Sequence, residues 1–229
     1  AIIQGVVQGL TEFLPVSSSG HLAITQHILG AGTGESNLFF NVMLHVGTLV
    51  AVVAFYHKLV WDLIKEFFLM LKDIFTGKFK WSKMNYNRNL VVMLIIGLIP
   101  LFLLFLPIPG TDMKLKDLAD QLSASPVLIV TACSLILTSV LLTIGIIRNR
   151  KSVASTHKHL ATKSNAKATR DNFNVVDAIL VGVTQVCAAL LPGLSRSGST
   201  LSVGEMRGIS KQKALDYTFV LGIPSILAA

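Results

Sequence analysis

Long apolar runs separated by short polar connections set the pattern of this chain. Apolar runs cover residues 38–56, 89–106 and 125–147, and a fourth begins near Ala214 and continues to residue 229. A helix of about 20 apolar residues crosses the hydrocarbon core of a membrane, and each of the first three runs is close to that length. The pattern therefore predicts an all-α integral membrane protein.

Two further apolar segments are interrupted near their middle. Residues 1–29 are broken at Pro15, and residues 175–208 are broken at Pro192-Gly193. Neither half of either segment is long enough to span, and broken backbone is tolerated at membrane depth only where protein or water surrounds it. We therefore expect two re-entrant helical hairpins.

The two hairpins carry the same motif. In each copy Gly-x-x-Gln, ending at Gln8 or Gln185, precedes Leu-Pro, and Leu-Pro precedes a serine-rich turn. We call residues 17–20 the first serine turn and residues 195–199 the second serine turn. Because three spans, an odd number, lie between the hairpins, the copies should enter the membrane from opposite faces. The sequence thus predicts an inverted-topology repeat whose two turns meet near the membrane midplane.

The repeat defines the expected organisation of residues 1–229 as a single membrane domain. The first repeat covers about 1–106 and the second about 125–229. The chain begins without Met inside an apolar run and stops inside another, so we expect both ends to be trimmed. Within the first repeat, residues 57–75 mix charged and aromatic residues, as in an amphipathic helix at the inner membrane surface.

Composition and charge support the membrane assignment. The chain is 52% apolar and 14% charged, with a mean hydropathy of +0.65, whereas soluble domains carry about 25% charged residues. The net charge of +8 comes mainly from two basic connections, residues 57–88 and 148–170, which we expect to be cytoplasmic. Membrane topology explains these charges, so we expect membrane lipids and no nucleic acid as partners.

Each serine turn stands immediately before a helical stretch, and the start of a helix offers unpaired N–H groups with a partial positive charge. Two such helix starts that meet would form a cradle for an anion, above all a multiply charged one. Arg196 adds a rigid donor fork that suits phosphate or carboxylate. The residues expected around such an anion are Ser17, Ser19, Ser195, Arg196 and Ser197.

The first hairpin adds candidate catalytic groups. Glu12 is a carboxylate in an apolar half-helix, one turn after Gln8, and the two together could hold a divalent cation. His21 could act as a general acid or base, and a neighbouring base could activate Ser18 as a nucleophile. Plain alternatives stay open at this point, because serine-rich turns are often only helix caps and His45 could be a buried structural histidine.

These residues carry a family resemblance. Gln8-x-x-x-Glu12, the Pro-Val-Ser-Ser-Ser-Gly-His run of residues 15–21, and the Pro-Gly-Leu-Ser-Arg-Ser-Gly-Ser-Thr run of residues 192–200 resemble the undecaprenyl-pyrophosphate phosphatases of the bacitracin-resistance type. The resemblance covers the whole chain and implies about two more helices beyond residue 229. It implies hydrolysis of undecaprenyl diphosphate, which recycles the lipid carrier for peptidoglycan synthesis and confers bacitracin resistance.

The resemblance also implies roles for individual residues. Glu12, Ser18, His21 and Arg196 would be catalytic, and a divalent cation, Mg²⁺ or Ca²⁺, would be needed. The phosphate site would comprise Ser195, Arg196, Ser197 and Thr200. Many members have Glu where this chain has Gln8, which removes one charged metal ligand.

Further expectations from the resemblance concern location and partners. The protein would lie in the bacterial cytoplasmic (inner) membrane with its active site towards the outer side, and it would bind a polyprenyl diphosphate. Whether it forms a homodimer is open.

Two questions of mechanism stay open at this stage. Ser18 could attack the terminal phosphorus while His21 moves the proton, or His21 could be the nucleophile. A membrane transporter or flippase for a lipid phosphate or small anion is the alternative function, because such carriers also use broken helices that meet at the midplane.

Overall fold

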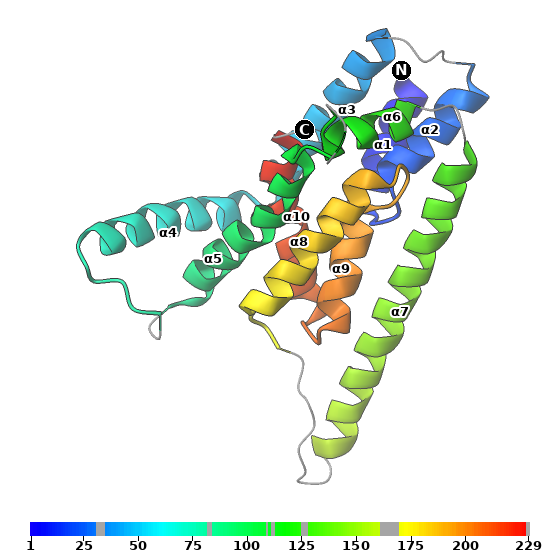
Figure 1. The fold of residues 1–229 in the computed structure, drawn as a ribbon. Helices are drawn as coiled ribbons and strands as arrows, with labels where there is room; N and C mark the ends of the chain where they lie inside the picture. Colours follow the sequence, from blue (N-terminus) through cyan, green and yellow to red (C-terminus); the bar gives the residue numbers. More distant parts are fainter. Residues whose placement is uncertain are drawn as a thin grey trace.

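A computed structural model describes residues 1–30, 35–81, 84–108, 110, 113–124, 128–160 and 170–227. Within those residues the protein is helical and contains no strand, which confirms the all-α part of the predicted fold class (Figure 1). The helices are α1 Ile2–Phe13, α2 Ser18–Ile28, α3 Glu35–Phe55, α4 His57–Phe75, α5 Tyr86–Leu98, the 3₁₀ helix η2 Ile99–Phe105, α6 Leu115–Ala124, α7 Leu128–Leu160, α8 Val175–Leu190, α9 Arg196–Met206 and α10 Lys211–Leu227.

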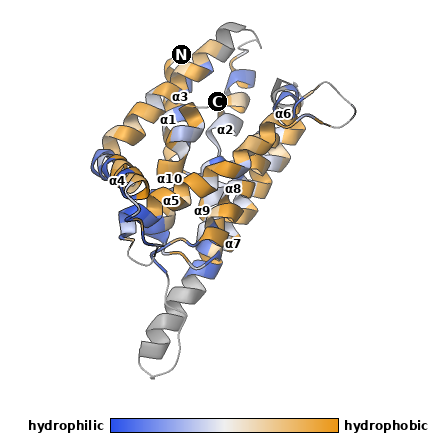
Figure 2. Ribbon diagram, turned by 60° about the vertical axis from the view of Figure 1, so that its left-hand side comes forward, coloured by the Kyte–Doolittle hydropathy of each residue, from blue (hydrophilic) through white to orange (hydrophobic). Residues whose placement is uncertain are grey.

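Among the described residues, two helical segments are long and apolar enough to cross a membrane without a break. They are Tyr86–Phe105, which joins α5 to η2, and Leu128–Asn149, the first part of α7. The run expected over residues 38–56 forms α3, but the chain bends by 82° between Phe39–Phe55 and His57–Phe75. Figure 2 shows hydrophobic residues along α3, α5, α7 and α8.

The structure differs from the sequence pattern in two places. Helix α7 continues to Leu160, into the second basic connection, because no Gly or Pro follows Gly145 in that helix to end it. The connection between residues 107 and 124 contains the short helix α6, which its charged sequence did not reveal.

Both interrupted segments form two helices around the expected break. Helix α1 ends at Phe13 and α2 begins at Ser18, while α8 ends at Leu190 and α9 begins at Arg196. Proline lies in both breaks, where its missing N–H and fixed φ stop the first helix. Figure 1 shows the turn between α1 and α2 facing the turn between α8 and α9.

Close packing of α5, α8, α9 and α10 holds the second turn in place. The ring of Tyr217 stacks on Phe173 with centroids 4.0 Å apart, and its hydroxyl donates to the backbone oxygen of Met93 at 2.6 Å. Gly182 lets α8 approach α5 closely, because a Cβ there would lie 2.5 Å from the backbone oxygen of Gly97. A polar turn between these helices is therefore supported by a rigid apolar frame.

A buried carboxylate fixes the far ends of α8 and α9. Asp177 is fully buried, and its two oxygens accept from Arg207 Nε at 2.7 Å and Arg170 Nη2 at 3.0 Å. Asp177 also forms a capping box with Asn174 at the start of α8. These contacts join the chain before α8 to the end of α9, so they fix the hairpin from the side opposite its turn.

Candidate active site

The first serine turn is held by its own hydrogen bonds. The Ser17 hydroxyl caps α2 by accepting from the N–H of Gly20 at 3.2 Å. The backbone of Ser17 has φ of 76°, in the left-handed region that residues other than glycine seldom occupy. Such strain is kept where surrounding contacts enforce it, and it concentrates at functional sites.

The second serine turn is built in the same way and is anchored to α7. The Ser195 hydroxyl caps α9 by accepting from the N–H of Gly198 at 2.9 Å. The N–H of Ser195 donates to the hydroxyl of Thr138 at 3.0 Å, in a buried contact that our sequence analysis missed. The available signal was a polar side chain within an apolar span.

The two turns touch each other at Gly198. A Cβ on this residue would overlap the backbone carbonyl oxygen of Pro15 and would lie 3.1 Å from Ser195 Cβ. Only glycine allows the turns to approach this closely. Two polar turns that are about 180 residues apart in sequence are therefore adjacent in space, as the repeated motif predicts.

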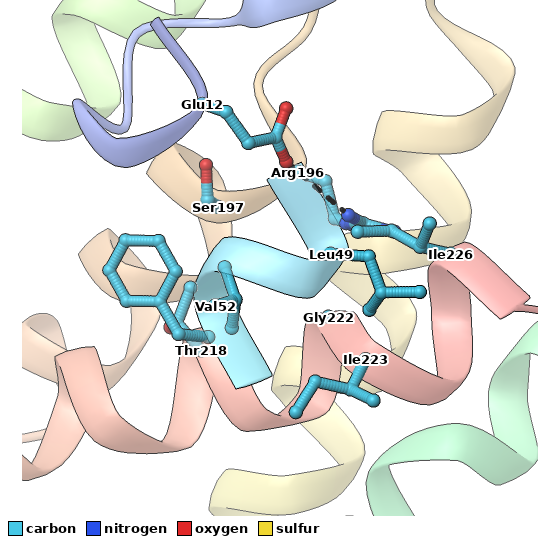
Figure 3. Close-up of a pocket in the computed structure, with 10 residues that line it drawn as sticks. Glu12, Leu49, Val52, Arg196, Ser197, Thr218, Gly222, Ile223 and Ile226 are labelled. Atoms are coloured by element: carbon cyan, nitrogen blue, oxygen red, sulfur yellow. Dashed lines mark ion pairs between the residues drawn. The ribbon is translucent and has the colours of Figure 1, made fainter. Parts of the chain in front are cut away.

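Glu12 lies at the centre of this junction. Its Oε2 accepts from the hydroxyl of Ser18 at 2.5 Å and from Nε2 of Gln8 at 3.2 Å. Its Oε1 lies 3.8 Å from Nη2 of Arg196, across the boundary between the hairpins (Figure 3). The Glu12 side chain is only 12% exposed, so solvent screens this contact weakly. Three residues singled out from the sequence, Gln8, Ser18 and Arg196, thus converge on the carboxylate of Glu12.

A small cavity beside Glu12 and Arg196 has mainly apolar walls. It encloses about 20 Å³, room for roughly one water molecule. Ser197 and Thr218 contribute polar atoms, and its apolar lining is Leu49, Val52, Phe219, Ile223 and Ile226. Charged groups at the edge of an apolar wall suit a ligand with an anionic head and an apolar tail. The charged groups could be predicted from the sequence, but this apolar wall could not.

The histidine predicted to be catalytic has a fixed orientation. Nδ1 of His21 lies 2.8 Å from the backbone oxygen of Ser17, and because a carbonyl can only accept, Nδ1 carries the proton. In the neutral ring Nε2 then keeps a free lone pair and can accept a proton. The hydroxyl of Ser18, however, is bonded to Glu12 and not to His21.

Three other predicted residues surround this centre with different exposures. Ser197 lines the cavity, and Ser19 lies on the exposed side of the first serine turn. Thr200 is buried, and its hydroxyl donates to the backbone oxygen of Arg196 at 2.9 Å. Thr200 is thus placed to fix the backbone that carries Arg196.

A second, larger cavity of about 330 Å³ lies on the other side of the first serine turn. Ser19 lines it together with His45, Asn41 and Gln26. Gln26 Nε2 donates to Asn41 Oδ1 at 2.7 Å, and Nδ1 of His45 donates to the Asn41 backbone oxygen at 2.8 Å. His45, which the sequence left between a structural and a functional role, therefore borders this cavity, whose walls are both polar and apolar.

The donor atoms near Glu12 are those that a hard divalent cation prefers. Gln8 Oε1 is buried and has no hydrogen-bond partner in the described part of the chain, and it lies on the residue that contacts the Glu12 carboxylate. Across the described residues no three His, Cys, Asp or Glu side chains form a metal-binding group. A carboxylate and an amide oxygen suit Mg²⁺ when phosphate oxygens of a ligand complete the shell. The residues present fit a cation that binds together with a phosphate ligand.

Comparison with known proteins identifies relatives across the full chain. The family described as "Bacitracin resistance protein BacA" matches residues 1–229. A protein of Alkaliphilus metalliredigens named undecaprenyl-diphosphatase is 39% identical over 230 residues, which cover 100% of this chain and 74% of the relative. Proteins with the same name from Methanobrevibacter smithii (37% identity, 100% of this chain, 73% of the relative) and Parabacteroides distasonis (34%, 99% and 71%) are also similar.

Proposed function

The chain belongs to the family of the bacitracin resistance protein BacA, and we propose that it hydrolyses undecaprenyl diphosphate to undecaprenyl phosphate and inorganic phosphate. The observation that carries this proposal is the junction of Ser18, Glu12 and Arg196, which places a hydroxyl, a carboxylate and a guanidinium at one point. Its product would return to peptidoglycan synthesis, and its activity would confer the bacitracin resistance of the family name.

We propose that Arg196 and the two helix starts bind the diphosphate. The guanidinium offers paired donors to phosphate oxygens, and the N–H groups that begin α2 and α9 add partial positive charge. In the structure Arg196 faces Glu12, and the cavity between them is too small for a diphosphate. Binding must therefore draw Arg196 away from Glu12, and the apolar wall would receive the start of the prenyl chain.

In the first chemical step the Ser18 oxygen would attack the terminal phosphorus. The new Oγ–P bond forms as the bond from that phosphorus to the bridging oxygen breaks, and undecaprenyl phosphate leaves. Glu12 is placed to accept the hydroxyl proton, since it already accepts the hydrogen bond from Ser18. Donors aimed at the transferring group, above all Arg196, would supply most of the rate acceleration.

In the second step water would attack the phosphorus of the phosphoserine as the Oγ–P bond breaks. Inorganic phosphate would leave, and the Ser18 oxygen would take back the proton from Glu12. His21 is suited to take the proton of that water, because its hydrogen bond to Ser17 leaves Nε2 free. Attack by His21 itself, with Ser18 as a phosphate ligand, is the alternative. Trapping the phosphoenzyme and locating the phosphate on Ser18 or His21 distinguishes the two.

We also propose that a divalent cation, Mg²⁺ or Ca²⁺, binds with the substrate. Glu12 and Oε1 of Gln8 would hold it, and the ion would neutralise charge on the diphosphate.

The proposed topology is the inverted repeat, with two re-entrant hairpins in the inner membrane and the active site open to the outer side. The contact between Gly198 and Pro15 supports it, because two half-spanning hairpins can touch only if both reach the membrane interior. A transporter or flippase of lipid phosphate would share this topology. Binding alone, however, does not require a hydroxyl bonded to a carboxylate.

The test is phosphate release from undecaprenyl diphosphate by the purified protein in detergent, with Mg²⁺ and with a chelator. We expect release that the chelator abolishes and that falls at least about 100-fold in Arg196→Ala and Glu12→Ala, as for loss of a transition-state donor. A Lys116→Ala variant, changed in the first turn of α6, is the control. Undiminished release in either active-site variant, or exchange of labelled lipid across liposomes without release, would overturn the proposal.

A further inference from the structure

Helix α4 leaves the bundle at a steep angle and is held there by α5. The bend from α3 is 82°, and Figure 1 shows α4 and α5 extending together to one side of the other helices. Leu63 and Met70 are buried in the core between them. Arg88 of α5 donates to Glu66 at 3.2 Å and to Asp73 at 2.7 Å. The inward face of α4 is therefore fully engaged, and its orientation is fixed.

The outward face of α4 is aromatic and exposed. Trp61, Phe68 and Phe75 follow one another at intervals of seven residues and are 59%, 64% and 87% exposed. Seven residues are close to two helical turns, so these rings form one stripe, to which Ile64 adds. The charges of α4 make it a poor spanning helix, yet this stripe is poorly suited to water.

A stripe of lysines borders the aromatic stripe. Lys58, Lys65 and Lys72 are also seven residues apart, all are exposed, and they lie about 40 to 60° around the helix from the aromatic rings. Nζ of Lys65 lies 5.6 Å from the centre of the Trp61 ring. The aromatic rings and the ammonium groups thus face almost the same direction, with the charges along one edge.

We propose that α4 lies in the membrane interface without crossing it and binds the headgroups of anionic phospholipids. The aromatic stripe would enter the acyl region just below the headgroups, and the three lysines would pair with lipid phosphates. Three cations along one edge of an apolar face match a surface of phosphate charge above hydrocarbon. The contacts of Arg88 would hold the helix in that plane.

Fluorescence of a single tryptophan tests the position of α4. Trp61 and Trp81 are the only tryptophans, so Trp81→Phe leaves Trp61 as the reporter in the full chain, reconstituted in liposomes. We expect lipids brominated near the headgroup end of the acyl chain to quench Trp61 more strongly than lipids brominated near the chain end. Trp61 lies near the start of α4, so the same comparison is made with Trp61→Phe/Phe68→Trp/Trp81→Phe, which places the reporter near the middle of the helix. Stronger quenching of that reporter by the deep bromines would show a spanning helix, and no quenching of either reporter would show a face covered by protein or water. Either result would overturn the proposal.

Lipid preference tests the role of the lysines. Brominated phosphatidylglycerol and brominated phosphatidylcholine, compared at equal total bromine, report which lipid gathers around Trp61. Attraction between the basic residues and anionic headgroups predicts at least about a twofold preference for phosphatidylglycerol that salt weakens. Lys65→Gln/Lys72→Gln should bring the ratio towards one, while the matched double variant Lys114→Gln/Lys116→Gln should not. A ratio of one in the parent, or equal loss in both double variants, would overturn the lipid-binding claim.

Discussion

Replacing Gly198 by Ala should separate the two serine turns while keeping the helices. In an ordinary helix this change would stabilise the protein by about 0.5 to 1 kcal/mol. Here the added Cβ would overlap the carbonyl oxygen of Pro15 and press on Ser195. Because a backbone oxygen cannot move aside as a flexible side chain does, the turns must shift apart. Overpacking of this kind costs about 1 to 3 kcal/mol, which outweighs the gain in helix propensity.

Gly198→Ala should reduce the activity more than it reduces the stability of the protein. Glu12 and Ser18 belong to one hairpin and Arg196 to the other, so a shift between the turns changes the distances at the reacting centre directly. A displacement of about 1 Å is enough to reduce the rate about 100-fold. We expect kcat/KM for phosphate release to fall by about that factor in Gly198→Ala, with a lower midpoint of thermal unfolding in detergent.

Gly47→Ala is the matched control. Gly47 lies in α3, and a Cβ there would have no heavy atom within 4 Å. This variant should keep its activity and unfold at the same temperature or slightly higher. If Gly198→Ala were as active as Gly47→Ala, the close approach of the turns would have no part in catalysis and the reasoning would be refuted.

Three further results are expected. Asp177→Asn removes the charge that Arg170 and Arg207 share and should lower the free energy of unfolding by about 2 kcal/mol or more. Asp62→Asn, at an exposed surface pair, should change it by less than about 0.5 kcal/mol. Equal effects of the two variants in chemical denaturation would contradict this prediction. Ser18→Ala should abolish phosphate release while Ser19→Ala keeps most of it, and the reverse order would exclude Ser18 as the nucleophile. Gln8→Glu should lower the Mg²⁺ concentration for half-maximal activity by about tenfold, because it adds a second carboxylate at the proposed cation site. An unchanged Mg²⁺ titration would show that the side chain at position 8 does not bind the cation.

The sequence predicted those parts of the fold that depend on local chemistry. Pro15 and Pro192 each stand beside a polar, serine-rich turn, and the two signals together mark a helix break, whereas Pro224 lies inside α10 without ending it. Both breaks could therefore be predicted directly. The extension of α7 to Leu160 could not be predicted, because polar residues can continue a helix as well as form a connection. Neither Gly nor Pro follows Gly145 in that helix to mark an earlier end.

The polar residues of the candidate site could be predicted from the sequence, but the apolar residues that line its cavity could not. Glu12 and Arg196 stand out because charged residues are rare in apolar segments, and the repeated motif placed them on two hairpins that should meet. The partnership of Ser18 with Glu12 depends on how the first turn closes, which spacing alone does not determine. Phe219 and Leu49 look like ordinary residues of apolar helices, and only the packing of α3 and α10 around the junction reveals them as cavity lining.

Double-mutant kinetics test most directly whether the two hairpins form one active site. Phosphate release from undecaprenyl diphosphate would be measured for Glu12→Ala, Arg196→Ala and the double variant. If both groups act on the same transferring phosphoryl group, the double variant should retain about the activity of the less active single variant. Losses in kcat/KM that multiply in the double variant would show independent actions and would contradict a single site built from both hairpins.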